Sequence, residues 1–276
     1  MIKERGQVLL IVLLVMVIAL TVGLSVASRN ITNLRTSREE ASSQKALAAA
    51  EAGIEQALKT NTTIPIGTSF TGEPQTTYGT TVNAVSGTEV LLTGGNVVPK
   101  DEGADIWLVP HNLPPDETPN FSLPWTGNLT IYWGDTSDVC DQTPANNTMA
   151  ALEVAVVSGP VSSPVLTRSA YDPCAIGRSS NNFSAALGGG TVSDKSFSHS
   201  TSIIPITSGL LVRVAPLYAS TPIAVTVNTG PALPSQGIRI DSTGESQGTT
   251  RKINVFKGYP QLPVQYFLYG LFSPNP

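Results

Sequence analysis

An uninterrupted apolar run limits what this chain can fold into more than any other feature. The run covers residues 8–27, reads VLLIVLLVMVIALTVGLSVA, and contains no charge, proline or amide side chain. A helix of that length rises about 30 Å, which matches the hydrocarbon core of a bilayer. A water-soluble domain rarely places so uniform an apolar run on one helix. The run therefore predicts a membrane-spanning helix.

The residues after this run predict that the helix continues well beyond the membrane. Between Ser28 and Lys59 the chain has no proline and a single glycine, Gly53, and its second part is rich in strong helix formers. Apolar residues recur there at spacings of three and four: Leu47, Ala50, Ile54 and Leu58. Such a stripe is typical of a helix that packs on its own domain. We expect one helix over residues 7–59, on the order of 80 Å long.

The composition changes at about residue 60. All 21 prolines lie at or after Pro65, and short segments rich in β-branched and aromatic residues are bounded by Gly, Pro, Asn and Asp. The strands predicted from these segments cover residues 80–85, 88–93, 106–109, 128–133, 151–157, 164–169, 209–216, 223–227, 237–241, 251–256 and 265–271. Their spacing favours hairpins over alternating βα units. The predicted fold class is α+β, a long helix followed by a mostly antiparallel β domain over residues 60–276.

Residues 1–6, before the apolar run, allow three interpretations. An ordinary signal peptide would be cut near Ala27, although the apolar run exceeds the ~7–15 residues typical of such peptides. A plain uncleaved anchor is the second interpretation. The third is a prepilin-type leader, which is cut between Gly6 and Gln7 and leaves the apolar run on the mature protein. The long helical segment that follows favours the third.

Residues 1–59 resemble the type IV pilin family, especially the PilX-like minor pilins and the related secretion pseudopilins. The resemblance rests on a short basic leader ending in Gly6, a retained apolar helix, and the small-residue segment AAEAG at residues 49–53. It implies cleavage by a prepilin peptidase, a helix that binds other pilin subunits, and a cytoplasmic N-terminus. The chain departs from the family at two places. Most members have Phe or Met after the cut, where this chain has Gln7, and Glu at the fifth residue after it, where this chain has Ile11.

Ile11 bears on the place of such a subunit in a filament. In the family, the Glu at this place is matched by the free amine of an adjacent subunit. A carboxylate in hydrocarbon costs on the order of several kcal/mol unless a partner charge is available. A subunit with no neighbour ahead of it has no such amine, so Ile11 predicts a tip position. The alternative is a membrane-anchored helper that never enters a filament.

The charge distribution argues against a nucleic-acid partner. Residues 60–276 carry 9 Lys and Arg against 15 Asp and Glu, a net charge of −6, whereas residues 1–59 carry 7 against 5, a net charge of +2. Phosphate binding needs clustered cations, which an acidic outer part does not provide. No small-molecule substrate is indicated either.

The two cysteines predict a disulfide. Cys140 and Cys174 both follow the membrane segment, and in an oxidising compartment such a pair favours a covalent bond. The bond would close a loop of about 35 residues and stabilise the fold by roughly 3.8 kcal/mol in the chain-entropy model.

Candidate catalytic residues are few. The two histidines, His111 and His199, lie in polar segments, and a His-based site would need both. Residues 244–248 read GESQG and match the GxSxG string of hydrolases. A strand is predicted after Ser246 where a nucleophile elbow requires a helix, and no histidine follows it. We therefore expect a hairpin loop there, no enzyme activity and no cofactor.

A weak calcium site is the one metal hypothesis that the sequence offers. Asp135, Asp138 and Asp141 are spaced by three residues beside Cys140, and carboxylate oxygens in a loop can hold Ca²⁺. The spacing is not that of an EF-hand, and a solvated acidic loop is the simpler interpretation.

The remaining segments complete the functional hypothesis. Residues 112–123 and 178–200 are polar and are expected to form loops, while the aromatic residues of the C-terminal segment suit a last strand or a docking surface. The resemblance implies a minor pilin-like subunit of the cytoplasmic membrane, single-pass with its C-terminal domain outside, that enters a pilus or secretion pseudopilus. The alternative is an anchored or secreted β-rich binding or adhesion module.

Overall fold

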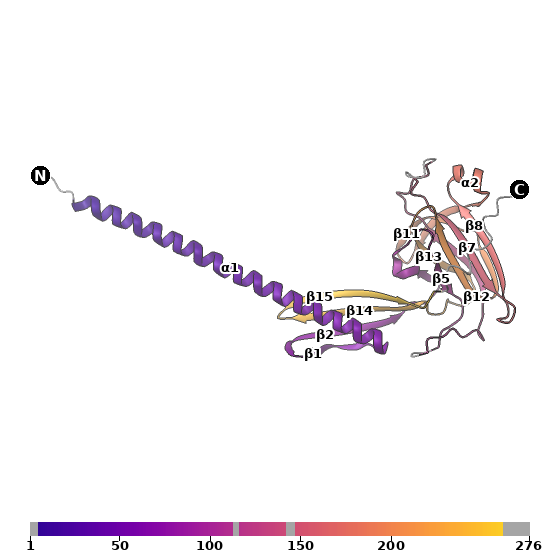
Figure 1. Ribbon diagram of the computed structural model, residues 1–276, viewed down its shortest axis with the longest axis horizontal. Coiled ribbons are helices and arrows are strands. Elements are labelled where there is room, and N and C mark those ends of the chain that lie inside the picture. Colours follow the sequence, from indigo (N-terminus) through magenta and orange to yellow (C-terminus); the bar gives the residue numbers. More distant parts are fainter. Residues whose placement is uncertain (1–4, 113–115, 142–146, 262–276) are drawn as a thin grey trace. The chain divides into compact units, whose positions relative to one another are not determined.

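The computed structural model describes residues 5–112, 116–141 and 147–261 of the chain. It contains two compact units (Figure 1). The first consists of Met1–Thr81 together with Asp241–Asn254, and the second of Val82–Ile240 together with Val255–Pro276. The sequence predicted a single outer domain from residue 60, whereas the structure groups residues 60–81 and 241–254 with the long helix.

The first unit is built on helix α1 (Arg5–Thr60), which has 56 residues (Figure 1). Its apolar part has a mean hydropathy of 2.9 and is not buried at all, and the helix is long and apolar enough to span a membrane. All residues from Leu10 to Ala41 are exposed. The structure therefore confirms the long N-terminal helix, within two residues of its predicted start and one of its predicted end.

From Ser42 onward, one face of α1 is buried against a sheet. The sheet has the order β1-β2-β14-β15, with strands β1 (Ile64–Phe70), β2 (Glu73–Ala84), β14 (Gly237–Ser246) and β15 (Thr249–Gly258). The buried residues of α1 are mostly small: Ser42, Ala46, Ala49, Ala50, Gly53, Ile54 and Ala57. The predicted apolar stripe is half right, because Ala50 and Ile54 are buried whereas Leu47 is 41% exposed.

The second unit is built on an eleven-stranded sheet. Its main path has the order β10-β11-β6-β12-β7-β8-β9, while β13 pairs with β3, β4 and β6, and β5 pairs with β12. The strands are β3 (Glu89–Leu91), β4 (Val97–Val98), β5 (Ala104–Trp107), β6 (Trp125–Trp133), β7 (Ala151–Ser158), β8 (Val165–Asp172), β9 (Ser184–Ala185), β10 (Leu187–Val192), β11 (Lys195–Ser200), β12 (Ile204–Leu217) and β13 (Thr221–Thr229). Among the described residues, the strand pairings of this sheet are antiparallel except for that of β8 with β9.

Side chains alternate between the two faces of this sheet, and those on one face form an apolar core. Trp133, Leu129 and Ile131 of β6 are fully buried in the same apolar cluster as Leu152 of β7 and Val212 of β12. Because side chains alternate between the two faces of a strand, the odd residues of β7 and β12 lie on the other face of the sheet.

The structure confirms the α+β class and most predicted strands, and corrects the sequence analysis at three places. Residues 178–200 were expected to form a loop, but they contain the end of helix α2 (Ala175–Asn181), strand β9 and the β10–β11 hairpin. Strands β1 and β4 were missed. A short 3₁₀ helix, η1 (Leu92–Gly95), replaces the end of the strand predicted at residues 88–93. The strand predicted at residues 265–271 lies outside the described residues.

Candidate functional site

The first half of α1 presents a continuous apolar surface. Leu10, Val15 and Leu24 are among many large apolar side chains exposed along it, and Ile11 is 58% exposed. The hydroxyl of Thr21 donates to the carbonyl of Ile18 over 2.8 Å. Such internal bonds are what a helix needs in lipid, where no water satisfies polar groups. This half is suited to an apolar environment outside the chain.

The predicted processing site lies at the beginning of the same helix. Gly6 and Gln7 belong to the first turn of α1, which begins at Arg5. Ile11 follows one turn later. Cleavage after Gly6 would therefore leave the apolar surface complete and would place Ile11 near the new end of the helix.

The second half of α1 is held against its sheet by close backbone approach. A Cβ on Gly244 of β14 would overlap the carbonyl oxygen of Ala46 and would lie 2.6 Å from the amide nitrogen of Ala50. A Cβ on Gly53 would lie 2.6 Å from the hydroxyl of Ser242 and 3.0 Å from the side chain of Thr80. Glycine on both elements thus allows a contact that any larger residue would push apart.

The GESQG string turns out to be the element on which the helix packs. Gly244 admits the backbone of α1, and the buried hydroxyl of Ser246 shares a 3.0 Å hydrogen bond with that of Thr76. Gln247 accepts a 3.2 Å bond from Ser42 of the helix. Gly248 has a φ of +82° and turns the chain from β14 into β15. The predicted hairpin is confirmed, and the structure adds that its residues hold α1.

Further polar bonds connect α1 to the strands. The hydroxyl of Ser242 donates to the carbonyl of Ala50 over 2.8 Å, in a buried setting. At the rim, Lys45 forms a 2.8 Å ion pair with Glu73. These partners are up to 205 residues apart in the sequence, so no sequence pattern places them together.

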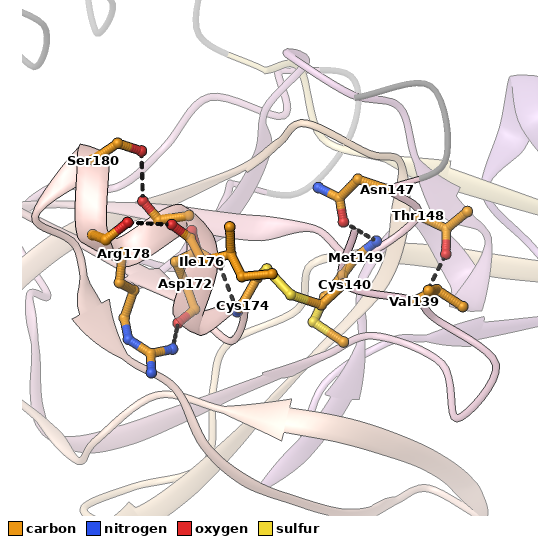
Figure 2. The surroundings of a disulfide bond; sticks show 12 residues. Val139, Cys140, Asn147, Thr148, Met149, Asp172, Cys174, Ile176, Arg178 and Ser180 are labelled. Atoms are coloured by element: carbon orange, nitrogen blue, oxygen red, sulfur yellow. Dashed lines mark hydrogen bonds between the residues drawn. A yellow bond between two sulfur atoms is a disulfide. The ribbon is translucent and has the colours of Figure 1, made fainter. Parts of the chain in front are cut away.

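The predicted disulfide is present between Cys140 and Cys174, whose Cα atoms are 5.4 Å apart (Figure 2). Cys174 immediately precedes α2, and buried Asp172 stabilises this junction. One carboxylate oxygen of Asp172 accepts from the backbone of Cys174 over 2.8 Å, and the other from the side chain of Asn181 over 2.7 Å. Arg178 donates to the backbone carbonyl of Asp172 over 2.7 Å. The disulfide therefore fastens the acidic segment before Cys140 to a well-bonded helix start.

The three aspartates of the calcium hypothesis mostly serve the turn itself. A carboxylate oxygen of Asp135 accepts from the backbone and the hydroxyl of Ser137, and these bonds lower the pKa of Asp135. Asp138 accepts from the backbone of Asp135 over 2.8 Å. Within the part of the chain that the structure describes, no group of three or more His, Cys, Asp or Glu could hold a metal. Calcium binding at Asp135, Asp138 and Asp141 stays a weak prediction.

The two histidines occupy separate aromatic surroundings. His111 stacks on Tyr259 with ring centroids 3.7 Å apart and meets the edge of Trp107. His199 lies beside Trp133. Burial lowers the pKa of both, and Glu117 opposes the effect at His111 as Asp138 does at His199. Each histidine packs as a ring in its own cluster, and the described contacts do not bring the two together.

A cavity of about 310 Å³ lies beside the disulfide. Its lining includes Lys100, Asp141, Ile176 and Tyr218, which come from separate segments of the second unit. No sequence pattern predicts this cavity, because its lining residues share no motif.

No protein-family model, no curated protein and no solved structure matches this chain.

Proposed function

We propose that this chain is a minor pilin-like structural subunit. It is held in the cytoplasmic membrane by the first half of α1, with its β units outside, and is then incorporated into an extracellular filament. One observation carries the proposal. A single 56-residue helix leaves its apolar half fully exposed while its other half is packed on a sheet. A signal peptide that is removed by cleavage does not need to form one continuous helix with a packed segment of the mature protein.

Assembly rather than catalysis follows from this arrangement. The exposed surface around Leu10–Ala27 would exchange lipid for the apolar helices of neighbouring subunits, two environments of similar polarity. The packed half keeps the outer units attached while the helix moves from one environment to the other. The glycine contacts at Gly53 and Gly244 make the contact between the helix and its own sheet close and stiff.

Ile11 supports a place at or near the filament tip. Its side chain is apolar and exposed on the free half of α1, where most pilins carry a glutamate. Without a carboxylate at this place, the subunit has no group to match the amine of a subunit ahead of it. The second unit, with its own sheet and disulfide, is then available at the end of the filament for adhesion or priming.

Immunogold labelling of the second unit on sheared filaments tests the proposal. We expect gold at filament ends. Gold along the whole shaft would contradict the tip position. Gold confined to cell membranes would contradict incorporation and favour an anchored binding or adhesion module.

A processing variant provides the matched control. Gly6→Leu should leave the leader uncut and remove gold from filaments while the membrane pool stays labelled, because a bulky residue blocks cleavage beside the membrane. Gly6→Ala, which keeps a small side chain, should label filaments as the parent does. Equal labelling of filaments by both variants would contradict leader-dependent assembly.

A further inference from the structure

The cavity of about 310 Å³ beside the disulfide lies among four connections at one end of the sheet of the second unit. They join β4 to β5, β6 to β7, β8 to β9 and β12 to β13. The strand register brings them together, because Leu217 at the end of β12 pairs with Ala151 at the start of β7. Tyr171, near the end of β8, pairs with the adjacent Leu152. Loops that a rigid sheet positions in this way commonly carry binding sites.

Covalent and hydrogen bonds connect the walls of this cavity. The disulfide joins Cys140, in the β6–β7 connection, to Cys174, in the β8–β9 connection. Asn181 of α2 donates to buried Asp172 over 2.7 Å and to the hydroxyl of Tyr218, in the β12–β13 turn, over 3.3 Å. The cavity is therefore preformed, and binding does not have to order its walls.

The turn between β12 and β13 has an unusual backbone conformation. Tyr218 has a φ of +72°, in the left-handed region that bulky residues rarely adopt. The hydroxyl of Ser220 in the same turn accepts from the backbone N–H of Lys100 over 2.9 Å, which fastens the turn to the β4–β5 connection. Strained residues that their surroundings hold in place are concentrated at functional sites. This conformation places the side chain of Tyr218 in the cavity lining.

Two exposed apolar side chains line the cavity from separate segments. The side chains of Tyr218, in the turn, and Ile176, on α2, are each 44% exposed. Gly177 and Ser180 of α2 line the cavity as well. In Figure 2, Ile176 and Ser180 lie on one side of the disulfide and Asn147 on the other. A ligand in the cavity therefore meets an aromatic ring and an aliphatic side chain.

The polar part of the lining provides both donors and acceptors of hydrogen bonds. These groups are the ammonium of Lys100, the amide of Asn147, the hydroxyl of Ser180 and the carboxylate of Asp141. Asp172 also lines the cavity, but both of its carboxylate oxygens accept hydrogen bonds from the protein itself. The other two charged groups, Lys100 and Asp141, have opposite signs, so the lining favours neither an anion nor a cation.

These properties favour a neutral saccharide over a charged ligand. A sugar ring has hydroxyl groups that both donate and accept, and C–H groups on its faces that pack on an aromatic ring. The side chain of Lys100 is 52% exposed and lies 3.8 Å from Asp101, and an exposed cation contributes little to the binding of an anion. The cavity is at the lower end of the roughly 300–1,000 Å³ typical of small-molecule sites, which suits a mono- or disaccharide.

We propose that this cavity is a binding site for a neutral saccharide. Tyr218 and Ile176 form its apolar surface, and the polar lining bonds the hydroxyl groups of the sugar. Every described lining residue belongs to the second unit. The inference therefore does not depend on whether the chain enters a filament.

Saturation-transfer NMR on the full chain, purified in a detergent without a sugar headgroup, tests the proposal. The probes are lactose and the methyl glycosides of glucose, galactose, mannose and N-acetylglucosamine. We expect transfer to at least one of them. Tyr218→Asn should weaken binding about tenfold or more, because asparagine tolerates the left-handed φ but has no ring. Tyr218→Phe, which keeps the ring, should bind nearly as the parent does.

Phe121→Ala is the matched control, since it removes another exposed ring of the second unit, from a segment outside the described lining. It should leave binding unchanged, and denaturant unfolding checks that each variant folds. Transfer to none of the probes would overturn the proposal, and so would equal binding by the parent and Tyr218→Asn. Affinity should change little in high salt, because the ligand is neutral. A steep loss with salt would assign the cavity to a charged ligand instead.

Discussion

The two halves of α1 have the same secondary structure and opposite relations to the rest of the protein. The first half carries the large apolar side chains, and they are exposed. The second half carries alanines and a glycine, and those that face the sheet are buried: Ala46, Ala49, Ala50, Gly53 and Ala57. Apart from Ile54, which is buried against the sheet, the exposed bulky residues on this helix are therefore directed at an environment outside the chain. Small residues attach the helix to its own sheet, because the contact is made by backbone approach.

Side-chain size, and not hydrophobicity alone, distinguishes the half of this helix that packs on the sheet from the half that is exposed. Leu47 lies within the docked half and is nevertheless 41% exposed, while Ala46 beside it is fully buried. A leucine at the contact would hold the helix away from Gly244. The docked half can be disturbed by adding one methyl group, whereas the free half should tolerate it.

The largest expected effect is that of Gly244→Ala. The new methyl group overlaps the carbonyl of Ala46, which is backbone and cannot move aside. Overpacking of this kind costs about 3 kcal/mol. Denaturant unfolding of the full chain in detergent measures the loss. Gly188→Ala is the control, since its Cβ meets open space. Equal stability of the two variants would mean that the close contact is not needed.

Alanine at Gly23 and alanine at Gly53, both within α1, should have opposite effects. Gly23→Ala adds a methyl group with nothing within 4 Å and should favour the helix by up to about 1 kcal/mol. Gly53→Ala makes the same gain but places its Cβ 2.6 Å from the Ser242 hydroxyl, for a net loss of about 1–2 kcal/mol. Unfolding free energies of the two variants give the signs. A stabilising Gly53→Ala would contradict the account of docking.

A smaller effect is expected from the hydroxyl that bonds the sheet to the helix. Ser242→Ala removes the 2.8 Å bond to the carbonyl of Ala50 and should cost about 1 kcal/mol. Thr21→Val, which removes a hydroxyl bond within the free half, should leave the docked half unchanged. The double variant that combines Ser242→Ala with Gly53→Ala should be more stable than the sum of the two single losses predicts. The reason is that the Ser242 hydroxyl, the atom nearest to the new methyl group at residue 53, is then absent. If the two losses of unfolding free energy simply add, the strain of Gly53→Ala does not come from the Ser242 hydroxyl.

The smallest effect concerns the rim of the docked half. Lys45 and Glu73 form an ion pair in which both side chains are about two-fifths exposed. Lys45→Met should therefore cost about 0.5 kcal/mol or less, and the difference should vanish in high salt. Unfolding with and without added salt measures it. A loss above the Ser242→Ala value would show that charge, and not close packing, dominates the docking.

The same comparison shows how far the sequence could predict the fold. The apolar run and the lack of proline up to Lys59 were sufficient for α1, since both act locally. The face of α1 that packs on the sheet could not be predicted from the sequence, because Gly244 and Ser42 contact partners about 200 residues away. An apolar stripe was expected where small residues lie.

A strand that is rich in glycine was also missed by the sequence analysis. Residues 188–190 of β10 are three glycines, and they lie in the segment 178–200 that was expected to form a loop. In the structure, Gly189 lies so close to the backbone of Phe197 on β11 that a Cβ would overlap its carbonyl oxygen. Glycine has a low intrinsic preference for strands, and only the pairing partner shows why it is used there. The disulfide, by contrast, was predicted correctly from the number of cysteines and the expected oxidising compartment.

The most direct test of the central claim, that both halves of α1 remain one helix in the working protein, is the N-terminal sequence of the mature protein recovered from cells. We predict a chain that begins at Gln7 and retains residues 8–27, so that the free half stays joined to the docked half. A mature chain that begins at Ser28 would contradict the claim, because the apolar half would then be a discarded signal.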